Sequence, residues 1–192
     1  MSKPVVIIIT GRPGTGKTTL GKHLAHRYRL PFVHKDGIKE VLFDALEDQS
    51  LELSLKLGLS SILLLHYFIK VLVTVGQSLI VEANFNPALA TAEWLALKES
   101  YPFIPFQVQC YTESEVLLQR FTKRIGTPER HPGHPDQARL AANPTFLQGP
   151  LDHMQIGGYT FAIDTTDFAT IDYANLYVTI EEALNLVAWQ AQ

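Results

Sequence analysis

A glycine-rich segment near the start of the chain has the residue types and spacing of a phosphate-binding loop. Residues 11–18 fit the pattern G-x-x-x-x-G-K-[ST] without a mismatch and directly follow an apolar run at 5–9. Glycines let the backbone curl so that its N–H groups point at phosphate oxygens. Lys17 can then reach the β- and γ-phosphates, and the Thr18 hydroxyl can bind Mg²⁺. The segment predicts a nucleoside triphosphate site made by Gly11, Pro13, Gly14, Thr15, Gly16, Lys17, Thr18 and Thr19.

Asp36 is a second candidate, because it comes just after the strand predicted at 32–35. Side chains at the carboxyl ends of parallel strands face the ligand crevice, so we expect Asp36 near the γ-phosphate. Its carboxylate would accept the proton of an attacking hydroxyl, a step that an ionised phosphate acceptor does not need. The alternative is that Asp36 caps the helix predicted at 38–48, since aspartate is favoured at that position.

Glu82 and Asn84 stand at the end of the strand predicted at 78–83. A carboxylate at this point of a nucleotide-binding fold holds Mg²⁺ or a water bound to it. Thr18 and Glu82 are therefore the predicted metal-binding residues, and Asn84 would orient the substrate or the γ-phosphate. The alternative is a helix-capping network of these side chains with Asn86.

Three arginines follow in the second half of the chain. Arg120 and Arg124 are four residues apart and share one helical face, and Arg130 lies in a segment that we expect to form a lid at about 126–138. Guanidinium groups brought in by a closing loop would stabilise the charge on a phosphoryl group in transfer and exclude water. A solvated helix face is the alternative. The predicted catalytic residues are Lys17, Asp36, Arg124 and Arg130.

Histidine and cysteine do not predict a metal centre. His131 and His134 lie in the expected lid without a third ligand nearby, so we expect them to belong to the lid or to contact the substrate. Cys110 is the single cysteine of the chain, which excludes an internal disulfide and a thiolate cluster. In its apolar strand it is expected to act as a small hydrophobic residue.

Apolar runs and helical segments alternate along the chain, which predicts an α/β fold with a mostly parallel, five-stranded sheet and helices on both faces. Strands are expected at 5–10, 32–35, 78–83, 106–111 and 159–165, and helices at 17–29, 38–48, 51–75, 87–99, 113–125 and 180–191. The segment 126–150 is rich in proline and glycine and predicts an ordered or hinged loop. Signatures of helix starts occur at Asn86-Pro87, Thr112…Glu115 and Thr179…Glu182.

Length and charge favour one domain and a small substrate. The 192 residues, 46% of them hydrophobic, suffice for one core, and we expect a single domain over 1–192. A formal net charge of −3 lacks the basic field on which nucleic-acid binding rests, so a nucleic-acid partner is not expected. Nothing in the sequence predicts the oligomeric state.

Residues 57–75 have the length of a membrane span, but Gly58, His66 and Lys70 interrupt them. A buried core helix is the preferred interpretation, and no membrane partner is expected. The first residues run straight into the first strand without a cleavage site. We therefore expect a cytoplasmic protein, in agreement with its cysteine usage.

Residues 5–40, 80–86 and 106–135 together resemble the P-loop kinase group, which includes shikimate and gluconate kinases, chloramphenicol phosphotransferase and the polynucleotide 5′-hydroxyl kinase domain. Members share a phosphate loop, an aspartate downstream of its lysine and an arginine-bearing lid. The resemblance implies a three-layer P-loop fold, ATP with Mg²⁺, and transfer of the γ-phosphoryl group to a hydroxyl. It also implies that Arg120 and the loop around Thr165 hold the adenine.

The leading hypothesis is therefore a kinase that phosphorylates a hydroxyl of a small molecule. Alternatives are a nucleoside or nucleotide kinase, whose phosphate acceptor needs no base, and a nucleotide-binding sensor or ATPase that transfers nothing. A polynucleotide kinase would need a basic entry channel that the acidic balance does not indicate. The segments 38–75 and 131–134 are expected to surround the acceptor, and their apolar residues suggest an acceptor with hydrophobic surface.

Overall fold

The computed structural model describes residues 3–46, 50–149 and 152–189. Its strands form one parallel sheet in the order β2-β3-β1-β4-β5. The strands are β1 (Val5–Gly11), β2 (Phe32–His34), β3 (Leu79–Glu82), β4 (Ile104–Tyr111) and β5 (Tyr159–Asp164). The helices are α1 (Lys17–Tyr28), α2 (Lys35–Asp44), α3 (Leu51–Thr74), α4 (Pro87–Ser100), α5 (Ser114–Arg124), α6 (Asp136–Ala142) and α7 (Tyr173–Trp189). The predicted α/β fold with a five-stranded parallel sheet is confirmed.

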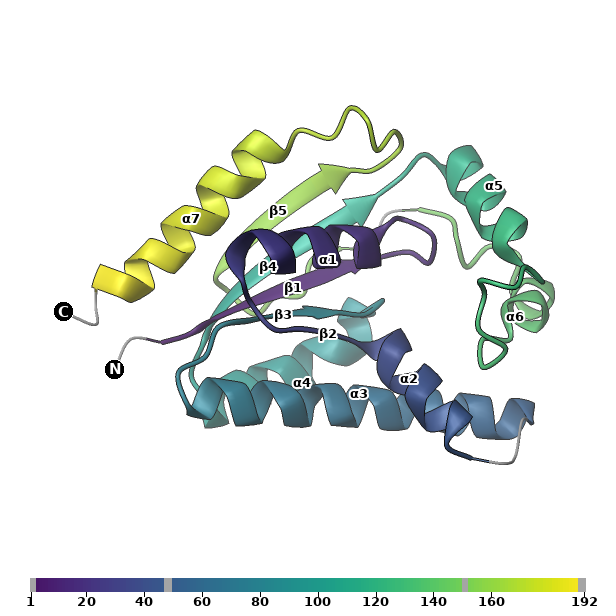
Figure 1. Cartoon of the computed structure of the whole chain (residues 1–192), viewed down its shortest axis with the longest axis horizontal. Helices are drawn as coiled ribbons and strands as arrows, with labels where there is room; N and C mark the ends of the chain where they lie inside the picture. The colour runs from purple at the N-terminus through teal and green to yellow at the C-terminus, as the bar shows by residue number, and fades with distance from the viewer. Residues whose placement is uncertain (1–2, 47–49, 150–151, 190–192) are drawn as a thin grey trace.

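Strand β1 lies at the centre of the sheet and is buried along its whole length. Successive side chains of a strand point to opposite faces. Ile7 and Ile9 accordingly pack with α1 and α7, whereas Val6 and Ile8 pack with α3 and α4. Figure 1 shows these two helical layers on either side of the sheet. The continuous apolar run at 5–9 is therefore explained by burial on both faces.

Helices α5 and α6 lie beyond the carboxyl ends of the strands, as Figure 1 shows. A separate apolar cluster joins them to the chain that follows α6: Leu117 and Phe121 of α5 pack with Phe146 and Leu147. Phe121 and Phe146 meet edge to face with ring centroids 5.2 Å apart. This cluster holds the lid region over the edge of the sheet where ligands bind in open α/β folds.

Helix α6 was not expected, because the segment 126–150 was interpreted as a loop. Its seven residues follow Pro135, and Asp136 occupies the first turn. A run so short shows too little periodicity to stand out among prolines and glycines. The apolar side chain that it does contribute, Leu140, packs against the cluster of α5.

Two of the three signatures of helix starts are wrong. Helix α7 begins at Tyr173 instead of 180: Asp172 accepts a hydrogen bond from the Ala174 N–H, and Thr179 is already inside the helix. The last residues predicted for this helix, 190–191, lie outside the described residues, as do 47–48 of the helix predicted at 38–48.

The predicted box at Thr112 is also absent, because Glu113 precedes α5 without a side-chain cap and the Thr112 hydroxyl bonds Thr165 at 2.7 Å. Asn86, by contrast, caps α4 as predicted and accepts a hydrogen bond from the Ala88 N–H at 3.1 Å. A side chain that could cap a helix can instead form a hydrogen bond to a residue elsewhere in the fold, and Thr112 does so with Thr165.

Helix α3 is only half buried, so the interpretation of 57–75 as a buried core helix is wrong for one of its faces. Leu65 and Ile69 are fully buried in the core, but the opposite face exposes a row of large side chains, among them Leu59 at 66% and Leu63 at 61%. In the described part of the chain, α3 is the helix long and apolar enough to cross a membrane, with 28% of its most apolar window buried. One such helix is weak evidence, because core helices of soluble proteins meet the same criteria.

Candidate active site

The phosphate loop, residues 11–18, joins β1 to α1 in a conformation that requires glycine. Gly11 has a φ of +145° and lies so close to Cys110 that a Cβ would collide with the Cys110 carbonyl oxygen. Gly16 stands at the start of α1 with a φ of +77°, a region that other residues adopt only with strain. Thr15 is buried and its hydroxyl donates to the Arg12 carbonyl at 2.8 Å. Gly11 and Thr15 therefore shape the loop from within.

Lys17 and Thr18 both meet the carboxylate of Glu82, which comes from the neighbouring strand β3. Thr18 Oγ1 donates to Glu82 Oε2 at 2.8 Å, and Lys17 Nζ lies 3.9 Å from Glu82 Oε1. Lys17 also donates to the Arg12 carbonyl at 2.9 Å. Glu82 is 5% exposed. The parallel pairing of β1 with β3, Ile9 beside Glu82, brings the two ends together.

The residues present fit a magnesium ion. Mg²⁺ prefers oxygen ligands and is bound by one or two protein groups together with phosphates and water. The Thr18 hydroxyl and the buried Glu82 carboxylate supply two such oxygens at one place. Glu82 takes no part in the cap of α4, so the capping alternative is wrong. Among the residues described, three or more His, Cys, Asp or Glu side chains do not gather as a metal cluster elsewhere.

Asp36 lies in the first turn of α2, directly after β2. The N-cap of this helix is His34, whose Nδ1 accepts a hydrogen bond from the Gly37 N–H at 2.9 Å. The interpretation of Asp36 as an N-cap is therefore wrong, and its carboxylate faces the cavity described below. Lys35 Nζ lies 3.4 Å from Asp36 Oδ1.

The carboxyl group of Asp36 is strongly acidic. Burial acts to raise its pKa, but the nearby positive charges of Lys35, His134, Arg130 and Lys17 outweigh burial and lower the pKa to about 2. Asp36 is therefore ionised throughout the physiological range. This proximity to Lys17 and Arg130 places Asp36 between the phosphate loop and the lid.

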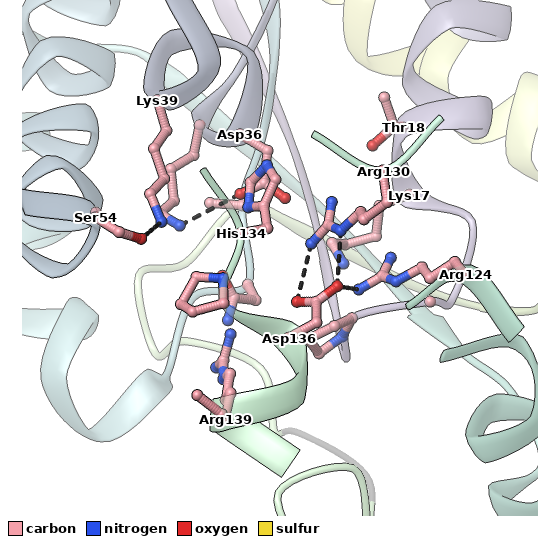
Figure 2. Close-up of a pocket in the computed structure, with 18 of the residues that line it drawn as sticks. Lys17, Thr18, Asp36, Lys39, Ser54, Arg124, Arg130, His134, Asp136 and Arg139 are labelled. Atoms are coloured by element: carbon pink, nitrogen blue, oxygen red, sulfur yellow. Dashed lines mark hydrogen bonds and ion pairs between the residues drawn. The ribbon is translucent and has the colours of Figure 1, made fainter. Parts of the chain in front are cut away.

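Arg124 and Arg130 converge on a carboxylate that the sequence did not single out, Asp136. Arg130 donates to both oxygens of Asp136, at 2.7 and 3.0 Å, and Arg124 Nη2 lies 3.3 Å from Oδ2. Burial and the charge of Arg130 lower the pKa of Arg124, although Asp136 opposes them. Arg124 Nε is buried without a hydrogen-bond partner among the residues described. Figure 2 shows this triad beside Lys17.

Arg120 is held by the loop that follows β5. Its two terminal nitrogens donate to the carbonyls of Thr165 and Thr166, each at 2.7 Å, and its guanidinium lies 4.4 Å from the centroid of the Phe168 ring. Thr165 itself is 1% exposed and its hydroxyl bonds the Tyr111 carbonyl. The structure thus joins Arg120 to the loop at 165 through the backbone carbonyls of Thr165 and Thr166.

The two lid histidines bind carboxylates of α2. His131 Nε2 lies 3.0 Å from Asp44 Oδ1, and His134 Nε2 lies 2.8 Å from Glu40 Oε1. Burial lowers the pKa of His134, although Asp36 and Glu40 act against it. Both histidines therefore join the lid to α2.

Cys110 is buried in β4, as expected of a small hydrophobic residue. Burial raises the pKa of its thiol to about 12, so the thiolate is absent at neutral pH.

One cavity of about 760 Å³ connects the phosphate loop with α2, α3 and the lid. Of the predicted site residues, it is lined by Pro13, Gly14, Gly16, Lys17, Thr18, Thr19, Asp36, Glu82, Arg120, Arg124 and Arg130. Gly11, Thr15 and Thr165 do not line it. The sequence did not indicate Lys39, Asp136 and Arg139, which also line it. For Lys39, the helical spacing of three from Asp36 was an available signal.

The fold and this site define a P-loop kinase-like protein. No protein-family model matches the chain, and no curated protein matches it. Among solved structures, a "putative kinase" from Chloroflexus aurantiacus is 34% identical and superposes with a TM-score of 0.84, over 97% of this chain and 99% of that one. The chain belongs to the P-loop kinase group together with that protein.

Two further structures share the fold. A sugar kinase from Janibacter sp. is 18% identical with a TM-score of 0.55, over 95% of each chain. A gluconokinase from Sinorhizobium meliloti is also 18% identical, with a TM-score of 0.54 over the whole of both chains. The predicted membership of the P-loop kinase group is confirmed by the first of these structures, and the other two share its fold.

Proposed function

We propose that the protein transfers the γ-phosphoryl group of ATP to a hydroxyl group of a small-molecule acceptor. The observation that carries this proposal is the common cavity, in which Asp36 lies between the phosphate loop and the lid arginines. Phosphoryl transfer needs positioning of donor and acceptor and neutralisation of charge, more than covalent chemistry by the protein. The residues that would position the substrates and neutralise their charge all line this cavity.

The donor side of the cavity would bind the triphosphate. Lys17, freed from the Arg12 carbonyl, would reach the β- and γ-phosphates, and the loop N–H groups would bind phosphate oxygens. Thr18 and Glu82 would hold Mg²⁺, which when bound neutralises charge on the β- and γ-phosphates. Arg124 and Arg130, held by Asp136, would donate their remaining N–H groups to the phosphoryl oxygens, where charge develops in the transition state.

Asp36 would orient the acceptor hydroxyl and receive its proton. With a pKa of about 2 its carboxylate is a weak base before substrates bind. Bound phosphates would offset the positive charges of Lys17 and Arg130, which raises the pKa of Asp36 when catalysis requires it. In a loose transition state the attacking hydroxyl gives up its proton late, so its orientation is the first requirement.

The experiment is ADP formation against a panel of sugars, nucleosides, hydroxy acids, sugar phosphates and 5′-hydroxyl oligonucleotides, repeated with Asp36→Asn. We expect kcat to fall about 10²-fold or more while nucleotide affinity is retained. Asp152→Asn is the matched control, because Asp152 is exposed and does not line the cavity. Loss of nucleotide affinity with unchanged turnover would contradict the role of Asp36.

The same panel, extended by nucleoside monophosphates, separates the alternatives. Turnover of a nucleotide acceptor that does not depend on Asp36 would indicate a nucleotide kinase. ATP hydrolysis at a rate that no acceptor changes would indicate an ATPase or sensor. Either result would overturn transfer to a hydroxyl.

A further inference from the structure

Lys39 is a buried cation without a counter-charge. The residue is 6% exposed, and its ammonium group donates to Ser54 Oγ at 2.8 Å. Ser54 in turn donates to the Gly133 carbonyl at 2.8 Å. Within the described ranges, no carboxylate lies at ion-pair distance from Lys39. Burial of an ammonium group against a hydroxyl alone is costly, so this arrangement is explained best by a ligand.

The charges around Lys39 are mostly positive. Burial and the positive charges of Lys35, Arg130 and Arg139 together lower the pKa of Lys39 to about 8, although Asp36 acts in the opposite direction. These groups come from α2, the lid and α6, and each of them lines the cavity. An anion bound among them would be attracted by all of the cations at once.

Arg139 is the second cation of this region without a carboxylate partner. It stands on α6 and packs its guanidinium over the Phe146 ring at 4.8 Å, and the described residues give it no ion pair. In Figure 2, Lys39, Ser54 and Arg139 lie on one side of Asp36, and Lys17, Thr18 and Arg124 lie on the other. The two unpaired cations are thus on the side away from the phosphate loop.

We propose that the acceptor carries an anionic group, a carboxylate or a phosphate, in addition to the hydroxyl that is phosphorylated. This anion binds Lys39 and Arg139, and the hydroxyl faces Asp36. Lys39 and Asp36 are three residues apart on α2 and so share one helical face. The anionic group and the hydroxyl that they bind can therefore belong to the same small molecule. The inference rests on the proposed function, because it assigns the acceptor end of that same cavity.

The apolar part of the cavity supports an acceptor of modest size. The cavity is also lined by Leu51, Leu55 and Gly58 of α3 and by Ala138 and Ala142 of α6. These side chains would contact the carbon skeleton between the two polar groups. The acceptor end is therefore cationic as well as apolar, which refines the expectation from sequence that it is chiefly hydrophobic.

The test measures anion binding to the full chain preloaded with Mg²⁺ and a non-hydrolysable ATP analogue, so that the phosphate loop is occupied. Inorganic phosphate and glycolate are titrated separately, with glycerol as the neutral probe, by calorimetry or by the rise in Tm. We expect one or both anions, and not glycerol, to bind. Lys39→Met and Arg139→Met should each weaken binding about tenfold or more. The stronger of the two anions indicates whether the acceptor is a phosphate or a carboxylate.

Lys56→Met is the matched control, because Lys56 is exposed and pairs with Glu52 on the outer side of α3. Lys39→Arg keeps the charge and should retain anion binding even if Lys39→Met folds poorly. Glycolate keeps its charge above neutral pH, so its affinity for the wild type should fall as pH rises through about 8, where Lys39 loses its proton. In Lys39→Arg the affinity should stay constant there.

The outcomes are distinguishable. Failure of the ATP analogue to bind would overturn the proposed function and this inference with it. Binding of the analogue without anion binding, or anion binding that Lys39→Met and Lys56→Met reduce equally, would overturn this inference and leave the proposed function standing.

Discussion

Arg130 and Asp136 form a two-pronged ion pair, with Nε and Nη2 of the arginine 2.7 and 3.0 Å from the two carboxylate oxygens. The Asp136 side chain is 8% exposed, and Arg124 contacts the same carboxylate at 3.3 Å. One buried carboxylate therefore holds two guanidinium groups that would otherwise repel each other. It aims both of them at the cavity before a nucleotide arrives, which is the kind of preorganisation that transition-state stabilisation requires.

Asp136→Asn should weaken both the fold and catalysis. Removal of one partner from a buried ion pair costs about 3–5 kcal/mol, because the remaining charges are left uncompensated. We expect a lower Tm, and a fall in kcat of about tenfold or more with a smaller change in ATP affinity. Thermal unfolding and single-turnover kinetics measure these effects. Asp136→Glu should restore part of each, and an Asn variant with full kcat would show that Asp136 does not position the arginines.

Glu82→Gln should raise the Mg²⁺ concentration that activity requires. The amide can still accept the hydrogen bond from Thr18, but it lacks the negative charge that attracts a divalent cation. A titration of ADP formation with Mg²⁺ at fixed ATP should give a half-saturating concentration about tenfold higher. Glu99→Gln, an exposed carboxylate of α4, is the control. Unchanged Mg²⁺ dependence would remove Glu82 from the metal site.

Arg12→Met should loosen the segment after α6. Arg12 donates to the carbonyls of Phe146, Gln148 and Gly149, at 2.6, 2.8 and 3.2 Å, and so ties the phosphate loop to the chain that follows the lid. Loss of these bonds should speed amide hydrogen exchange at 146–149 and raise the KM for ATP several-fold. Arg27→Met, which breaks an exposed pair with Glu181, should change neither.

Lys39→Met should stabilise the protein, because the folded state holds this ammonium group at a cost. Its pKa falls from 10.5 to about 8 on folding, so the unfolded state binds more protons between these pH values. The loss of stability caused by the buried ammonium group therefore has its full value below pH 8 and disappears as pH rises to 10.5. The pKa shift corresponds to a gain of about 3 kcal/mol in the free energy of unfolding when the ammonium group is removed. The lost hydrogen bond to Ser54 reduces this gain by about 1 kcal/mol.

Urea unfolding at pH 7 and at pH 10 measures this effect. The free energy of unfolding of Lys39→Met should exceed that of the wild type at pH 7, and the difference should shrink at pH 10. A variant that is less stable than the wild type at pH 7 would show that Lys39 stabilises the fold instead of destabilising it.

The donor side of the site could be predicted from sequence because its residues are local. The phosphate loop is one uninterrupted segment whose glycines and Lys17 have a single physical explanation. Glu82 and Asp36 follow apolar strands, and in a parallel sheet the ends of strands meet at one edge. The apolar runs predicted the starts of all five strands to within two residues, and Ile104 of β4 is the widest difference.

The acceptor side could not be predicted in the same way. The roles of Lys39 and Asp136 depend on partners that lie on other elements, Ser54 of α3 for Lys39 and Arg124 of α5 for Asp136. Asp136 also lies in a short helix that proline-rich sequence conceals. The exposed face of α3 was misjudged for a related reason: an apolar helix looks alike in sequence whether one or both of its faces pack.

Different segments of the chain line the two sides of the cavity. The phosphate loop and Glu82 would serve the nucleotide, whereas α2, the first two turns of α3, and α6 line the rest of the cavity. Under the proposed function, acceptor preference would then be separable from nucleotide binding. Exchanging α2, the start of α3 and α6 for those of another protein of this fold should change the acceptor and leave the phosphate loop as it is.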